Sequence, residues 1–116
     1  MIEKERTLKN LGSGWHSLIE TVYAIQDQLP FSGGLYVIER KNGMLSVLFS
    51  RKDLTSPEQE FILNSVEYRI ERLSAKICEG CGQYGLRRTE LPTTQTLCTK
   101  CYAFKYSEIV TPQNEE

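Results

Sequence analysis

The stretch Ile77–Phe104, ICEGCGQYGLRRTELPTTQTLCTKCYAF, contains all four cysteines of the chain and decides how its C-terminal part folds. The cysteines form two pairs with two residues inside each pair and 16 residues between the pairs. Zinc prefers a tetrahedral shell of soft thiolates, and double pairs at this separation are typical of structural zinc sites. The pattern therefore predicts one structural zinc ion held by Cys78, Cys81, Cys98 and Cys101.

The residues around the two pairs differ, which predicts a different backbone for each pair. Gly80 and Gly82 favour a tight turn around the first pair, because glycine tolerates positive φ. The second pair is followed by a run without glycine or proline, which indicates that it starts a helix. Residues 85–88 and 95–97 are expected to form a short hairpin between the pairs. Knuckle, hairpin and helix together make a treble clef; a zinc ribbon, with a second knuckle in place of the helix, is the alternative.

Other uses of the four cysteines fit the chain less well. Two disulfides would need an oxidising compartment, and we recognise no signal peptide at the start of the sequence. A redox pair would need a thioredoxin-like strand–helix–strand context, which the sequence lacks. Catalytic zinc sites keep an open position and usually include histidine or carboxylate ligands. The only histidine, His16, lies far from the cysteines in the sequence, so we expect a structural site and no catalytic residue.

Length and composition indicate one domain with a small metal-binding extension. The chain has 116 residues, of which 40% are hydrophobic and 25% charged, as in ordinary globular proteins. Its formal net charge of −1 gives no general attraction to nucleic acid or to membranes, and no apolar run reaches membrane-spanning length. We expect a cytoplasmic protein with a core at residues 1–77, a four-cysteine zinc module at 78–106 and a flexible tail at 107–116. Residues 1–10 are expected to be a mobile arm of the core.

Two amphipathic helices are predicted in the core. Apolar residues recur at spacings of three and four from Trp15 to Leu29, and Ser13 is a candidate N-cap for this helix. The second helix is expected to start after the cap Ser56, with Pro57 in its first position. It runs to about residue 77, so it leads directly into the first cysteine pair. Its buried stripe is predicted to contain Phe61, Ile62, Leu63, Val66, Ile70, Leu73 and Ile77.

A β-hairpin is predicted between the two helices. Two β-rich runs, Leu35–Arg40 and Leu45–Ser50, flank Asn42-Gly43, the strongest short signal for a hairpin. In a type I′ turn, Ile38 lies opposite Val47. The face expected to pack on the helices then carries Tyr36, Ile38, Leu45, Val47 and Phe49. The other face carries Leu35, Val37, Glu39, Ser46 and Leu48.

The predicted fold class is therefore α+β, with two amphipathic helices packed on a β-hairpin and a C-terminal treble-clef or zinc-ribbon module. The second face of the hairpin is half apolar, which is unusual for a face left in water. It also lies beside an unpaired strand edge, and such edges tend to be covered or paired.

Several short motifs occur together along the chain: Gly14-Trp15-x-x-Leu18-Ile19, Gly33-Gly34-Leu35, Ser74-Ala75-x-x-Cys78-Glu79-x-Cys81-Gly82, and Arg87-Arg88 before Leu97-Cys98. This combination, which extends from about Gly12 to Tyr102, resembles a family of small uncharacterised zinc-binding proteins of bacteria and their phages or mobile elements. In similar sequences the last ligand is often histidine; Cys101 takes that place here, which keeps four ligands. The resemblance implies a fold and a setting, and it implies no activity.

The favoured function is a protein-interaction module, such as an inhibitor or adaptor of a phage or mobile element. Leu35, Val37 and Leu48 on the half-apolar hairpin face are the candidate contacts, either for an unidentified protein partner or for a homodimer. The alternative is a nucleic-acid-binding zinc-finger regulator that contacts phosphates through Arg87 and Arg88. Four thiolates on zinc leave this module with a net charge of only about +1, so nucleic acid is the weaker candidate. The sequence contains no catalytic motif, so we expect no enzyme.

Overall fold

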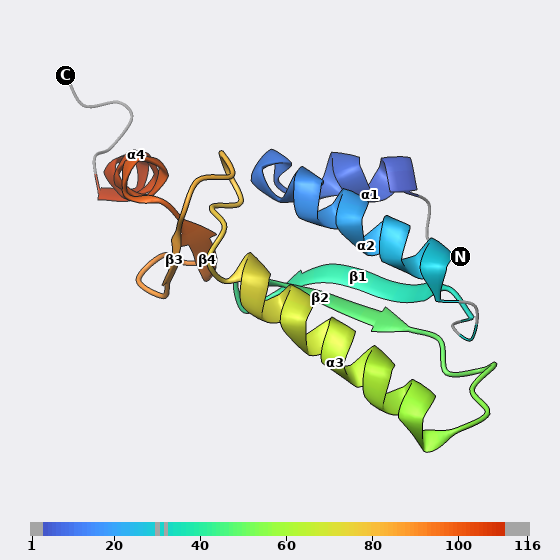
Figure 1. The fold of residues 1–116 in the computed structure, drawn as a ribbon. Coiled ribbons are helices and arrows are strands. Elements are labelled where there is room, and N and C mark those ends of the chain that lie inside the picture. Colours follow the sequence, from blue (N-terminus) through green and yellow to red (C-terminus); the bar gives the residue numbers. More distant parts are fainter. Residues whose placement is uncertain (1–3, 30, 32, 111–116) are drawn as a thin grey trace.

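A computed structural model describes residues 4–29, 31 and 33–110 (Figure 1). Its elements are, in chain order, α1 (Lys4–Asn10), η1 (Ser13–Trp15, one 3₁₀ turn), α2 (His16–Gln28), β1 (Leu35–Lys41), β2 (Met44–Phe49), α3 (Pro57–Ser74), β3 (Leu86–Arg88), β4 (Gln95–Leu97) and α4 (Thr99–Val110). The α+β class is confirmed: helices and the hairpin β1–β2 form the core, and the four cysteines follow with the hairpin β3–β4 and a helix. Residues 78–106 are called the cysteine module below.

The turn of the main hairpin has the predicted conformation. Asn42 and Gly43 both have positive φ, 55° and 78°, as a type I′ turn requires. Lys41 pairs with Met44, and Ile38 pairs with Val47, as the sequence predicts. The Asn-Gly signal therefore sets the strand register correctly next to the turn.

At the far end of the hairpin, a bulge changes which side chains face the core. The register shifts between Leu35, which pairs with Phe49, and Val37, which pairs with Leu48. One extra residue on a strand reverses the alternation of its faces beyond the bulge. Leu35 is consequently only 2% exposed, whereas Tyr36 is 68% exposed. The predicted faces are wrong for these two residues, and Leu35 is a core residue rather than a contact for a partner.

Helices α2 and α3 share one hydrophobic core with the hairpin, which runs between them in the view of Figure 1. The buried members of this core are Trp15, Leu18, Ile19, Val22, Tyr23, Leu35, Leu45, Val47, Phe49, Leu63 and Ile70. The start of α3 is as predicted, because Ser56 Oγ accepts a hydrogen bond from the Gln59 N–H. Around η1, in contrast, Ser13 makes no side-chain cap; the N-cap is Gly12.

The face that α3 turns towards the hairpin differs from the predicted stripe. Ser74 and Glu67 accept hydrogen bonds from the backbone N–H groups of Leu45 (2.7 Å) and Phe49 (2.8 Å). These contacts pair two N–H groups on the outer edge of β2 with side chains of α3, so the helix covers part of the edge that was expected to be unpaired. They also rotate the helix: Leu63, Ile70 and Ser74 are buried, while Phe61, Ile62 and Leu73 of the predicted stripe are exposed. The helix ends at Ser74, three residues before the predicted end at Ile77.

The ends of the chain depart from the expected arm and tail. Residues 4–10 form helix α1 instead of a mobile arm, because Thr7 is buried and Leu8 packs against the core. The ring of His16 bonds the Leu8 carbonyl, at 2.7 Å from Nε2, so this histidine fastens the helix to the core. At the other end, α4 extends to Val110, beyond the predicted start of the tail. Residues 1–3 and 111–116 lie outside the described residues. No helix in the described part of the chain is long and apolar enough to cross a membrane.

Candidate metal centre

The first cysteine pair lies on a tight backbone loop that follows α3. Cys78 is buried, and its carbonyl accepts a hydrogen bond from the Gly82 N–H at 2.8 Å. The Cys78 N–H donates in turn to the Gln83 carbonyl at 2.7 Å. Gly82 has φ of 86°, a conformation that residues with a Cβ rarely adopt. The knuckle predicted from the two glycines is thus present.

The second pair lies at the start of α4, as predicted. Cys98 follows β4 directly, and its carbonyl accepts a hydrogen bond from the Tyr102 N–H at 2.8 Å. Cys101 is in the first turn of the helix. The order of elements is therefore knuckle, hairpin β3–β4 and helix, which is the treble-clef arrangement rather than that of a ribbon with two knuckles.

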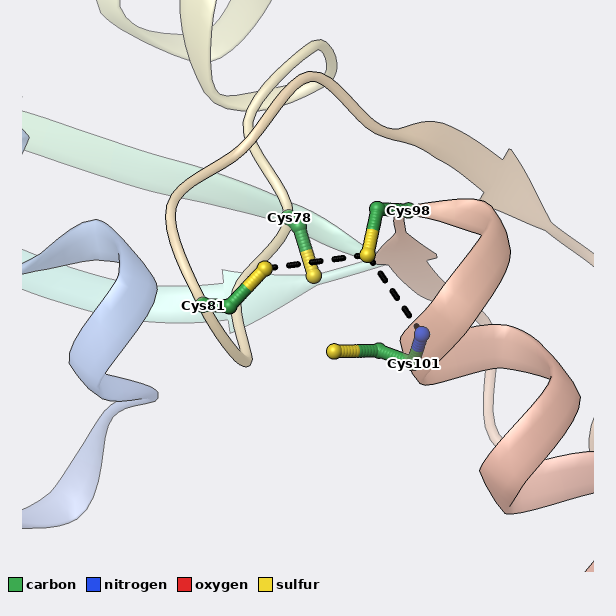
Figure 2. A group of neighbouring side chains, drawn as sticks. All are labelled: Cys78, Cys81, Cys98 and Cys101. Carbon is green, nitrogen blue, oxygen red and sulfur yellow. Dashed lines mark hydrogen bonds between the residues drawn. The ribbon is translucent and has the colours of Figure 1, made fainter.

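The four cysteine side chains converge on one point between the knuckle and the helix (Figure 2). Their sulfur atoms all lie within 4.8 Å of one another, and Cys81 Sγ is 3.6 Å from Cys98 Sγ. A tetrahedral zinc ion with Zn–S bonds of about 2.3 Å separates its sulfurs by about 3.8 Å. The cysteines are free thiols rather than disulfides. This donor set can hold one metal ion, and its chemistry and size suit zinc.

The local environment makes the cysteine thiols unequal. The backbone N–H of Cys101, 3.4 Å from Cys98 Sγ, lowers the pKa of the Cys98 thiol to about 7. Hydrogen bonds shared with the Cys78 and Cys98 thiols, together with burial, raise the pKa of Cys101 to about 12. A metal ligand must be a thiolate, so binding has to displace the Cys101 proton, whereas Cys98 is partly ionised at neutral pH.

Metal binding is therefore expected to release at least one proton per chain at pH 7.5, because Cys101 enters the reaction protonated. Calorimetric titration of the metal-free protein with zinc, in buffers of different ionisation enthalpy, measures this number as the slope of the observed heat against buffer enthalpy. The affinity for zinc should also fall as the pH is lowered. A slope of zero would contradict the assignment of Cys101 as a ligand.

The knuckle is held against the core by the loop that precedes α2. The Gly14 N–H donates to the Glu79 carbonyl at 2.9 Å, and the Trp15 indole N–H donates to the Ile77 carbonyl at 2.9 Å. A Cβ on Gly14 would lie 2.0 Å from the Cys78 carbonyl oxygen, so only glycine fits this approach. Ser13 Oγ donates to the Gly80 carbonyl at 3.3 Å instead of capping a helix. This contact was not predicted from the sequence; the signal for it is the glycine pair flanking Ser13 in front of a tryptophan.

An ion pair between a partly exposed arginine and a buried carboxylate fastens the knuckle to β1 as well. Arg40 donates to the Glu79 carboxylate through Nε at 2.8 Å and Nη2 at 2.7 Å, both to Oε1. The Glu79 side chain is only 4% exposed, and the Arg40 guanidinium lies 6.0 Å from the centre of the Trp15 ring. Glu79 is thus a residue of the junction between module and core, next to the ligand Cys78.

The hairpin β3–β4 contacts the turn of the main hairpin. Arg87 Nε donates to the Asn42 carbonyl at 2.7 Å, and Thr96 Oγ1 donates to the Gly43 carbonyl at 2.6 Å. Arg88 is half-buried: its guanidinium lies 4.4 Å from the Tyr102 ring centre, and its Nε donates to the Leu97 carbonyl at 3.2 Å. The cysteine module therefore contacts the core on two sides, at the knuckle and at the hairpin.

The predicted site residues fall into two groups in the structure. The four cysteines come together, and they are the one cluster of three or more potential metal ligands within the described ranges. The predicted partner contacts do not form one surface: Leu35 is buried, Val37 half-buried, Leu48 exposed, and the two arginines lie in the cysteine module. Comparisons with protein-family models, with curated proteins and with solved structures find no match to this chain.

Proposed function

We propose that the chain is a small protein, stabilised by one structural zinc ion, that acts by binding another protein. The four thiolates of Cys78, Cys81, Cys98 and Cys101 supply a complete tetrahedral shell, as zinc takes in structural sites. A complete shell leaves no coordination position for a substrate, which favours a structural role for the metal. When bound, the ion would link the knuckle to α4 across the module.

The observation that carries the protein-binding proposal is an apolar groove beside the cysteines. Its volume is about 1180 Å³, and it lies between the knuckle and the exposed side of α4. Tyr84 and Phe104 line it with exposed fractions of 69% and 68%, next to Leu97 and Ala103. Exposed aromatic rings beside an apolar depression are the usual anchors of protein–protein interfaces.

The polar residues of the groove favour binding over catalysis. Lys100 and Lys105 lie on its lining together with three of the four cysteines, and no histidine, aspartate or glutamate is among the lining residues that the structure describes. The groove thus lacks the side chains that most often transfer protons at neutral pH. We infer that the protein is not an enzyme and that its partner presents apolar side chains flanked by acidic ones. In the setting implied by the sequence resemblance, this is an inhibitor or adaptor.

Nucleic-acid binding is the second candidate, favoured by the same lysines and by aromatic rings on which bases stack. Against it, Arg87 and Arg88 already contact Asn42 and the Tyr102 ring within the chain. Lys100 and Lys105 alone make a smaller basic patch than is usual for nucleic-acid-binding domains. The protein-binding proposal therefore takes precedence.

A pair of matched substitutions tests where a partner binds. Phe104 and Tyr36 are both 68% exposed, the first in the groove and the second on the outer side of the hairpin. Phe104→Asp is expected to weaken binding of the native partner at least about tenfold, because it places a charge in an apolar contact. Tyr36→Asp is expected to leave binding unchanged. The tagged full chain captures the partner from its native host with and without nuclease, and calorimetry with the purified partner measures the affinities.

Circular dichroism and zinc content should be the same for both variants, since both side chains are exposed. Loss of binding with Tyr36→Asp and not with Phe104→Asp would contradict the groove as the binding site and favour the outer face of the hairpin. Capture that disappears after nuclease treatment would contradict a protein partner and favour the nucleic-acid alternative.

A further inference from the structure

The outward face of α3 carries large apolar side chains where a surface helix usually carries polar ones. Four of them lie opposite the side that packs on the hairpin, and they are 70%, 41%, 63% and 44% exposed in the order Phe61, Ile62, Tyr68 and Leu73. Helical periodicity places all four on one side of the helix, with Ser65 between them. Figure 1 shows this helix as an outer layer of the molecule.

The charged residues of this face are separated along the helix. Glu58 is in its first turn, and the cations Arg69, Arg72 and Lys76 occupy its last turns and the residues just after it. Within the described residues, neither Glu58 nor Lys76 forms an ion pair, since the ion pairs of that range join Lys4 to Glu20, Arg40 to Glu79 and Arg51 to Glu67. The face therefore has an unpaired acidic end and an unpaired basic end.

We propose that this face binds the same face of a second copy of the chain, with the two α3 helices antiparallel about a two-fold axis. Such an axis, placed over position 67, brings Glu58 opposite Lys76 and Phe61 opposite Leu73. It also places Ile62 opposite Arg72 and Ser65 opposite Arg69. A two-fold contact uses one patch twice, so a patch must complement itself when reversed, and the Glu58–Lys76 and Phe61–Leu73 pairs do so.

Packing within such a pair is consistent with the side chains present. Ser65 lies near the axis and is small, which lets the helices approach closely there. Arg69 and Arg72 have long aliphatic stems that can cover apolar surface while their charged groups remain in water. The dipoles of antiparallel helices also oppose each other favourably, each acidic N-terminal turn lying beside a basic C-terminal end.

The α3 face is a better self-association surface than the outer face of the hairpin. The bulge in β1 removes Leu35 from the outer face of the hairpin, which keeps the exposed Leu48 and the half-buried Val37 and gains the exposed Tyr36. The proposed line of contact along α3, from residue 58 to residue 76, is called the seam below; it is about 27 Å long at 1.5 Å per residue. One helix pair buries less than the roughly 1,200 Å² of standard stable interfaces, so the dimer should dissociate in the micromolar range.

Charge reversal at the two ends of the seam distinguishes this dimer from one formed through any other surface. Sedimentation equilibrium of the zinc-loaded full chain should show a monomer–dimer equilibrium in low salt. Glu58→Lys alone and Lys76→Glu alone should each weaken the dimer about tenfold, because each change creates repulsion at both ends of the seam. The double variant Glu58→Lys/Lys76→Glu should regain wild-type affinity within about twofold. An equal mixture of the two single variants should form heterodimers, since it restores opposite charges at both ends.

Substitutions of apolar residues distinguish the two candidate faces. Phe61→Ser should weaken the dimer at least about tenfold, and Leu48→Lys on the hairpin should leave it unchanged. A wild-type protein that remains monomeric at about 200 μM, well above a micromolar dissociation constant, would overturn the proposal. It would equally be overturned by a dimer that Leu48→Lys dissociates, or by failure of the double charge variant to regain affinity while its circular dichroism and zinc content are unchanged.

Discussion

Cys78→Ser is expected to abolish metal binding and to unfold the cysteine module. Cys78 is fully buried, and its backbone forms the hydrogen bonds that close the knuckle. Three thiolates and a serine hydroxyl no longer provide the shell that zinc prefers, and structural zinc contributes about 10–16 kcal/mol in small zinc-dependent domains. The module has only a small cluster of its own, with Cys78, Leu91 and Leu97 as its buried members, so little else holds it together.

The effect of this substitution should reach the core. Loss of the knuckle releases the Ile77 carbonyl from Trp15 and the Glu79 side chain from Arg40. We therefore expect the Tm of the whole chain to fall by at least about 10 °C, which corresponds to about 2–3 kcal/mol for a domain of this size. Differential scanning calorimetry measures the change, and wild-type protein treated with a strong chelator is the comparison. A variant that melts as the zinc-loaded wild type does would contradict the structural role of the metal.

Gly14→Ala is expected to have the second-largest effect, although Gly14 is not a ligand. A Cβ there would lie 2.0 Å from the Cys78 carbonyl oxygen and 2.5 Å from the Gly82 nitrogen, and both obstructing atoms are backbone. Either the loop or the knuckle must move, and the Gly14–Glu79 hydrogen bond is then lost. We expect a loss of about 3 kcal/mol or more in the free energy of unfolding, and a zinc affinity about tenfold or more weaker.

Gly33→Ala is the matched control for this substitution. A Cβ on Gly33 also meets close neighbours, but both belong to the Ser50 side chain: the hydroxyl oxygen at 2.6 Å, which can rotate away, and the Cβ at 2.9 Å, which requires only a small shift of the Ser50 loop. Gly33 lies at the far end of the hairpin from the cysteines. The free energies of unfolding measured in urea should differ by at least about 2 kcal/mol between the two variants, and zinc competition should show a weaker zinc affinity for Gly14→Ala alone. Equal behaviour of the two variants would contradict the role of the loop in supporting the knuckle.

The features of the fold that depend on local signals could be predicted from the sequence. The Asn42-Gly43 turn is an example, because a type I′ turn needs positive φ at both positions and these residues tolerate it. The metal centre is another, since the spacing of the cysteines alone restricts the geometry of their sulfurs. The capped start of α3 at Ser56 is local in the same sense.

The features that depend on distant contacts could not be predicted. The bulge in β1 accompanies the burial of Leu35 in the core and leaves no local signal in the strand. The rotation of α3 follows from Ser74 and Glu67 accepting β2 backbone N–H groups, which a count of apolar residues does not reveal. The same rotation exposes Phe61 and Leu73, and this mismatch between an apolar pattern and the core is what points to the α3 face as an interface.

Native mass spectrometry of the untagged protein, purified without added reductant, tests most directly whether the four cysteines hold one structural zinc ion. We predict one zinc ion per chain, with all four cysteines free of disulfides, and no zinc on a Cys81→Ser variant under the same conditions. A wild-type chain without metal, whose mass is lower by the four hydrogens lost in forming two disulfides, would contradict the account.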